Sequence, residues 1–243
     1  MSAALLYALL AAGGNLLGGL VITASSAGGR AAQRLLIAFG AGFMLTTAFV
    51  GMVPHAIEQG ADSAALGILL GYLLVHLTQH VITRHFHFGE ETHGDAMVDR
   101  WVGITALIGL LLHTFFDGVA IASSFHVGAW LGMLVFVAIL LHKIPEGVTL
   151  ASIMLASGNS RGRALGSVVL LGVVTIAGVL MTEWMGWLAN HGLALSAGVT
   201  IYVAASNLVP EVQKERSASG ALAVFVGSGL AYAALVMLRG VVE

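Results

Sequence analysis

Two histidine–carboxylate pairs stand 29 residues apart in long apolar stretches of the chain. They belong to the segments HTFFDGVAIAS, which begins at His113, and HKIPEGVTLAS, which begins at His142. In each segment a carboxylate follows four positions later, as Asp117 or Glu146, and a glycine comes next. Positions i and i+4 share one face of a helix, so each segment predicts one paired set of side chains. Ionisable residues at membrane depth indicate a functional site, and these four are types that bind divalent metals.

Imidazole suits zinc and its neighbours in the transition series, and carboxylate adds affinity for harder ions. Two histidines, one aspartate and one glutamate would fill the four positions of Zn²⁺, and they also suit Fe²⁺, Mn²⁺, Co²⁺ or Cd²⁺. The chain has no cysteine, which argues against a dedicated Cu(I) path. A single intramembrane histidine more often hydrogen-bonds between helices, but two pairs in register favour a metal site.

The composition predicts how these residues are positioned. Of 243 residues, 58% are hydrophobic and 9% are charged, against roughly 25% charged in soluble domains. The chain is therefore expected to be an all-α polytopic membrane protein in a lipid bilayer, with no nucleic-acid partner. A membrane span needs roughly 20 apolar residues. Residues 1–243 are expected to form one transmembrane domain with eight such spans. The expected helices are 3–24, 34–53, 64–83, 101–124, 130–156, 164–188, 194–213 and 219–239.

The basic residues predict the orientation. Eight of the ten Lys and Arg fall in connections on one side of the membrane, and the positive-inside rule makes that side cytoplasmic. Both termini are then expected outside. The host is expected to be a bacterial inner membrane, although an organellar membrane fits the same pattern. The eight residues are Arg30, Arg34, Arg84, Arg100, Arg161, Arg163, Lys214 and Arg216.

A faint internal symmetry links the second and seventh helices. The second is expected to end in MVPH at 52–55 and the seventh in LVPE at 208–211. Because the two helices run in opposite directions, the match hints at an inverted repeat, a common design of secondary transporters. Proline marking two unrelated helix ends explains the match almost as well.

The one long connection, 84–100, is rich in histidine and acidic residues. A His-rich tract suggests metal collection by composition, and a solvated cytoplasmic linker fits equally well. Its candidate ligands are His85, His87, Glu90, Glu91, His93 and Asp95.

The paired segments HTFFDG and HKIPEG resemble the fourth- and fifth-helix signatures of the ZIP family of divalent metal transporters. The eight spans and the His-rich loop extend the resemblance to essentially the whole chain. It implies a metal site between these two helices, zinc uptake into the cytoplasm, and a 3+2+3 inverted repeat. It also implies homodimers in which the first, fourth, fifth and sixth helices move against the others as an elevator.

Two positions depart from the family pattern. Thr114 stands where asparagine is usual, and Lys143 stands where Glu, Asp or Asn is usual. In relatives these positions help to bind a second metal. A lysine ammonium would repel that second cation, so a single metal ion is expected.

Five further residues are candidates for the ion pathway. Met44 falls where the family can place a soft ligand, although a core methionine is the simpler interpretation. His55 and Glu58 are expected at the outer mouth, or merely in a solvated connection. His76 and His80 share a face near the cytoplasmic end of the third helix, where packing at the interface is the favoured interpretation.

Two other functions fit a buried metal site. A membrane-embedded metal-dependent hydrolase would use the metal to activate water, but a catalytic zinc normally keeps one open position and no HExxH motif is present. A metal-sensing membrane protein would hold an ion without moving it. A transporter, and no enzyme, is the expected function.

Overall fold

A computed structural model describes residues 2–24, 30–82, 100–214 and 217–242. Every regular element in these residues is helical, and eight helices are long and apolar enough to cross a membrane, which confirms the predicted fold class. The elements are α1 (Ala3–Ala24), α2 (Arg30–Thr46), η1 (Thr47–Met52), α3 (Val53–Leu77), η2 (Thr78–Ile82), α4 (Arg100–Val127), α5 (Ala129–Ala156), α6 (Arg161–Trp184), α7 (Gly186–Ile201), η4 (Tyr202–Leu208), α8 (Val209–Gln213) and α9 (Ala218–Val242). The segments η1, η2 and η4 are π-helical.

The second and seventh spans each pass through a Val-Pro step without ending. The helix expected at 34–53 continues past Pro54, and the span covers Leu35–Gly60. The seventh span, Gly186–Gln213, likewise includes Pro210. A proline ring inside an α-helix clashes with the carbonyl four residues earlier, which is why the sequence predicts an end there.

A π-helical segment directly before each Val-Pro step explains the continuation. The N–H of Val53 bonds to the carbonyl of Ala48, and the N–H of Val209 bonds to the carbonyl of Ala204. Each bond spans five residues instead of four, so the widened turn moves aside the carbonyl that the proline ring would strike. The second span ends only at Gly60, where the extended backbone (φ −178°, ψ 80°) separates it from the third.

The boundary between the sixth and seventh spans also differs from the expected one. The helices expected at 164–188 and 194–213 meet at Met185, whose backbone is extended (φ −102°, ψ 103°). Residues 189–193, which the expected bounds leave between two helices, instead lie in the first turns of α7. Gly192 belongs to these turns, and a Cβ there would lie 2.7 Å from Cγ1 of Val119. The glycine therefore allows a close approach to α4 and does not break the helix.

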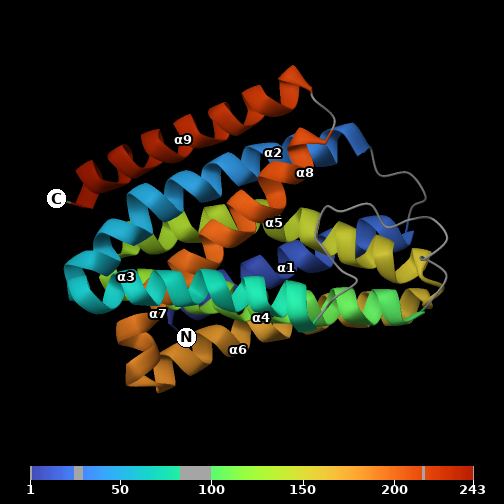
Figure 1. Cartoon of the computed structure of the whole chain (residues 1–243), viewed down its shortest axis with the longest axis horizontal. Helices are drawn as coiled ribbons and strands as arrows, with labels where there is room; N and C mark the ends of the chain where they lie inside the picture. Colours follow the sequence, from blue (N-terminus) through green and yellow to red (C-terminus); the bar gives the residue numbers. More distant parts are fainter. Residues whose placement is uncertain (1, 25–29, 83–99, 215–216, 243) are drawn as a thin grey trace.

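The helices pack in two groups. In the site group, α1, α4, α5 and α6 pack against one another; in the frame group, α2 packs along α9 and α3 along α7. Figure 1 shows α2 and α9 side by side along one edge of the molecule and α6 along the opposite edge. The groups meet mainly where α4 contacts α7 and where α2 contacts α5.

Backbones inside each group approach so closely that only glycine fits, as is common for helices packed in lipid. A Cβ at any of eight glycines would strike the backbone of a neighbouring helix in the same group. In the site group the contacts are Gly18 with Ile144, Gly147 with Asn15, Gly118 with Thr175 and Gly178 with Phe115. In the frame group they are Gly42 with Val224, Gly227 with Phe39, Gly71 with Leu195 and Gly198 with Ile68.

Glycines that face the other group meet mainly side chains, and the backbone that Gly40 approaches, at Leu141 of α5, lies at an ordinary van der Waals distance of 3.7 Å. A Cβ at Gly192 would meet a methyl group of Val119, and one at Gly51 would meet Cδ1 of Leu131 at 3.2 Å. A hydrogen bond also crosses the boundary, from the Ser196 hydroxyl to the Phe116 carbonyl at 3.1 Å. Backbone-to-backbone packing thus holds each group together, while side chains form much of the boundary.

Candidate metal centre

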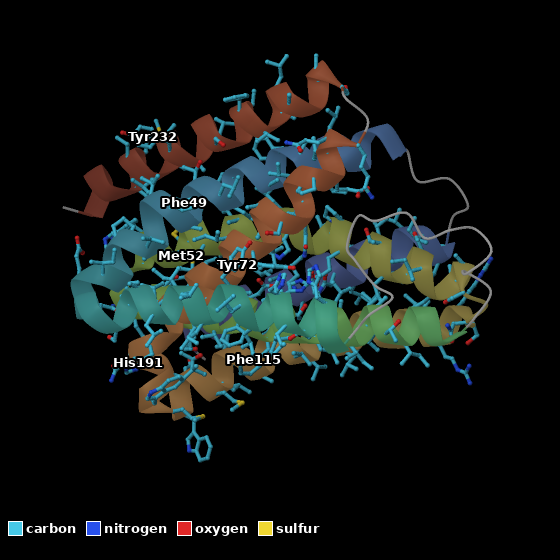
Figure 2. All side chains as sticks on the ribbon, in the orientation of Figure 1. Phe49, Met52, Tyr72, Phe115, His191 and Tyr232 are labelled. Carbon is cyan, nitrogen blue, oxygen red and sulfur yellow. The ribbon has the colours of Figure 1, made fainter. Side chains whose placement is uncertain are left out.

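The four predicted ligands come together between α4 and α5. His113 and Asp117 lie one turn apart on α4, and His142 and Glu146 lie one turn apart on α5. All four are buried, and one ligand atom from each lies within 4.8 Å of all the others. Figure 2 shows nitrogen and oxygen atoms gathered near the middle of the bundle, among side chains that are mostly carbon.

Two contacts between the helices join the histidines to the carboxylates. His113 Nε2 lies 2.9 Å from Glu146 Oε1, and His142 Nε2 lies 3.3 Å from Asp117 Oδ2. His142 Nδ1 lies 3.1 Å from the carbonyl of Ala138. That carbonyl can only accept, so Nδ1 is the donor of this bond and Nε2 is directed into the site, the usual orientation of a metal-binding histidine.

Lys143 contacts both carboxylates of the site. Its side chain is 0% exposed, and Nζ lies 2.7 Å from Asp117 Oδ2 and 2.6 Å from Glu146 Oε2. The ammonium also donates to the Thr114 hydroxyl at 3.2 Å, which in turn donates to Glu146 Oε1 at 2.8 Å. A single buried cation therefore bridges both carboxylates. The two residues that depart from the family pattern are in direct contact.

A third helix reaches the site through Asn15 of α1, which the sequence analysis missed. This side chain is 0% exposed. With its amide nitrogen facing the two nearby oxygens, it donates to the carbonyl of Lys143 at 2.5 Å and to Glu146 Oε2 at 3.1 Å. The signal in the sequence was a polar residue inside an apolar span, directly after Gly14 and three before Gly18.

A small cavity of about 10 Å³ opens beside the ligands. That volume is close to the roughly 10–15 Å³ that one water molecule needs, so it suits a single ion or water. Asn207 lines the cavity from η4, which continues α7 of the frame group. The lining residues are Ile37, His113, His142, Pro145, Glu146, Val203, Asn207 and Leu208.

The candidate pathway residues lie apart from this cavity. Met44 is buried in the apolar core and does not line the cavity. His55 Nδ1 donates to the carbonyl of Gly51 at 2.8 Å, and its Nε2 lies 3.9 Å from the exposed carboxylate of Glu58.

The rings of His76 and His80 stack with centroids 4.2 Å apart. Tyr202 packs edge-on against His76, and its hydroxyl lies 3.4 Å from His80 Nδ1. The six candidate ligands of the loop lie outside the described residues: His85, His87, Glu90, Glu91, His93 and Asp95.

The family model for ZIP zinc transporters matches residues 89–235, more than half of the chain, and the match includes both histidine–carboxylate pairs. The chain belongs to the ZIP zinc transporter family. No protein with a curated description matches it. ZIP proteins transport divalent metal ions and are not enzymes, so this protein is a multi-pass membrane transporter of divalent metals and the hydrolase alternative is set aside.

Proposed function

We propose that this ZIP protein carries Zn²⁺ into the cytoplasm through a site formed by His113, Asp117, His142 and Glu146. The convergence of four buried ligand atoms within 4.8 Å carries this proposal. Two imidazoles and two carboxylates match the tetrahedral coordination that zinc prefers. Cd²⁺, Fe²⁺, Mn²⁺ and Co²⁺ accept the same donors, so geometry and availability decide among them.

One ion is expected at a time. Lys143 Nζ contacts both carboxylates, so it occupies with fixed positive charge the region where a second cation would need ligands. Thr114 offers only a hydroxyl there, and that hydroxyl already donates to Glu146. Coulomb repulsion between an ammonium and a second divalent ion a few ångströms away disfavours a second ion.

The packing of the helices supports alternating access of the elevator type. Glycine-mediated backbone contacts lie inside the site group and inside the frame group, whereas Gly51 and Gly192 meet side chains of the opposite group. A site group that carries the ligands can therefore shift as one body along the frame group. Ile37 and Asn207 of the frame group line the cavity, so such a shift would change which residues face the ion.

A 3+2+3 inverted repeat is consistent with the same contacts. Exchanging α1, α2 and α3 with α6, α7 and α9 turns the packing of α2 on α9 into that of α7 on α3, and both contacts occur. When α4 and α5 are also exchanged with each other, the packing of α1 on α5 becomes that of α6 on α4, which also occurs. The π-helical segments η1 and η4 before the two Val-Pro steps correspond under this exchange.

The remaining features of the proposal concern the whole assembly. Residues 1–243 act as one transport domain, with both termini outside a bacterial inner membrane and eight basic residues facing the cytoplasm. Two copies form a homodimer. The molar mass of the protein in detergent, measured by light scattering, tests this. His55 and Glu58 lie at the outer mouth, and the loop 84–100 collects metal on the cytoplasmic side.

Uptake into proteoliposomes loaded with a fluorescent chelator tests the function. We expect saturable Zn²⁺ uptake that is abolished in His142→Ala and Glu146→Ala. His126→Ala and Glu183→Ala remove the same groups at exposed positions and should leave uptake unchanged. Tight zinc binding without uptake would refute transport and favour a sensor.

A cross-link tests the relative motion of the groups, because the chain has no cysteine of its own. A Cβ at Gly40 of α2 would lie 3.6 Å from Cβ of Leu141 on α5, within the usual range for a disulfide. Gly40→Cys with Leu141→Cys should stop uptake until reductant is added.

The matched pair is Gly19→Cys with Val168→Cys, which links α1 to α6 inside the site group at a Cβ–Cβ distance of 3.3 Å. It should cross-link without loss of uptake. Undiminished uptake in the first pair when fully cross-linked would rule out a sliding site group.

A further inference from the structure

We propose that Asn15 is a positioning residue that makes Glu146 a one-oxygen ligand and thereby favours small four-coordinate ions over larger ones. This proposal rests on the proposed function, because it concerns the same site. It goes beyond the four ligands by assigning ion discrimination to α1, a helix that provides none of them.

The contacts of the Glu146 carboxylate carry the first step. An ionised carboxylate has about four lone-pair positions on its two oxygens. Oε2 receives the Lys143 ammonium at 2.6 Å and the Asn15 amide at 3.1 Å. Oε1 receives the Thr114 hydroxyl at 2.8 Å and faces His113 Nε2 at 2.9 Å. Lys143, Asn15 and Thr114 therefore hold three positions, and His113 Nε2 holds the fourth in the metal-free site. A metal ion bound to His113 would take over that fourth position, on Oε1.

Lys143 alone would hold Oε2 less firmly. Its ammonium ends a flexible four-carbon chain with three rotatable donors, and it also contacts Asp117. When an ion binds Asp117, the ammonium can move, and its contact with Glu146 Oε2 can change. Asn15 has a short side chain whose amide also donates to the carbonyl of Lys143, so it holds Oε2 relative to the backbone of α5.

The glycines of the α1–α5 contact explain how so short a side chain reaches the site. A Cβ at Gly147 would strike the backbone carbonyl of Asn15, and one at Gly18 would strike the backbone carbonyl of Ile144. Gly14 faces the Lys143 side chain, with its own added Cβ 3.6 Å from Cβ of Lys143. The backbones are thus close enough for an asparagine amide to touch α5 directly.

The denticity of a carboxylate bears on ion size. Large cations accept more oxygens and commonly take both oxygens of one carboxylate, whereas zinc is satisfied by four ligand atoms. Holding Oε2 away from the ion removes the extra oxygen that a larger ion such as Cd²⁺ would use. Geometry of this kind, more than affinity, separates ions that share donors.

The variant Asn15→Leu replaces the amide with an apolar group of similar shape. Thr23→Val is the matched control, because Thr23 is also a buried polar residue of α1 and its hydroxyl bonds only to carbonyls of its own helix. Two readouts on purified protein are needed, namely competition between Zn²⁺ and Cd²⁺ for the site and the visible spectrum of bound Co²⁺. Neither requires transport, so failure of uptake and failure of this proposal are separable.

We expect Asn15→Leu to lower the Zn²⁺-to-Cd²⁺ binding ratio about tenfold, as loss of a hydrogen bond to a charged group implies. The Co²⁺ spectrum should lose the strong absorption of a four-coordinate ion. Thr23→Val should match the wild type in both. An unchanged ratio with an unchanged spectrum, or an equal loss of both ions, would overturn the proposal. If Asn15→Leu fails to fold, Asn15→Ser tests the proposal with the same two readouts, because serine is polar but too short to reach Glu146.

Discussion

Replacing Lys143 with methionine removes the one cation that bridges the two carboxylates of the site. Its Nζ lies 2.7 Å from Asp117 Oδ2 and 2.6 Å from Glu146 Oε2. At an effective dielectric constant of about 20, each pair is worth about 6 kcal/mol of Coulomb attraction. Desolvation of three buried charges offsets most of that, but removing one partner of a buried ion pair still costs about 3–5 kcal/mol.

Lys143→Met should therefore lower the melting temperature of the metal-free protein in detergent by about 6–20 °C, since 1 kcal/mol corresponds to about 2–4 °C for a chain of this size. Zinc should reverse the loss, because the ion replaces the missing positive charge and stabilises the folded state on binding. The rise in melting temperature on zinc addition should be larger in the variant than in the wild type.

Lys214→Met provides the matched control. Lys214 contacts Glu211 at 3.2 Å, but the two side chains are 39% and 36% exposed, and such pairs are worth about 0–1 kcal/mol. A shift of at most a few degrees, independent of zinc, is expected. If Lys143→Met melts like the wild type without metal, or gains no more from zinc than the wild type does, Lys143 does not balance the two carboxylates.

Three further changes test the site and its support. Lys143→Asp should raise bound zinc from one to two ions per subunit by elemental analysis, and an unchanged ratio would contradict the single-ion proposal. Gly147→Ala places a methyl group against the backbone of Asn15 and should cost about 1–3 kcal/mol of stability, measured by thermal melting. Gly13→Ala, with open space around its Cβ, should be neutral or slightly stabilising. Asn207→Ala should slow zinc uptake several-fold while zinc binding to purified protein changes less, because Asn207 lines the cavity beside the ligands but is not one of them. Equal losses of uptake and binding would refute that division of roles.

The spacing of two short segments sufficed to predict which residues meet. His113 with Asp117, and His142 with Glu146, follow from helical periodicity and from the cost of placing ionisable groups in lipid. The number of spans followed from composition. Both inferences depend on properties that are local in the chain, namely a one-turn repeat and a run of apolar residues.

Contacts between distant helices were beyond such reasoning. Asn15 precedes its partners on α5 by more than a hundred residues, and the close packing of the two helices at Gly14, Gly18 and Gly147 brings them together. The end expected at Pro54 was wrong because a π-helical segment accommodates the proline ring, and this depends on hydrogen bonds that single-residue propensities do not reveal. Gly192 was misread as a loop residue for a related reason, since its role is set by Val119 of another helix.

The π-helical segments η1 and η4 bear on which insertions and deletions this gene tolerates. Each accommodates what amounts to one extra residue within a continuous helix. Deleting one codon inside η4 would restore an ordinary α-helix with the turns on either side in nearly their present orientation, because the widened turn is what absorbs the extra residue. Val203 and Asn207, which lie inside the segment, would be the residues that move. A reading-frame-preserving deletion there would keep the span in the membrane and re-aim the face that lines the ion cavity. Natural length variation confined to these two segments would then change ion transport while leaving the number of spans intact.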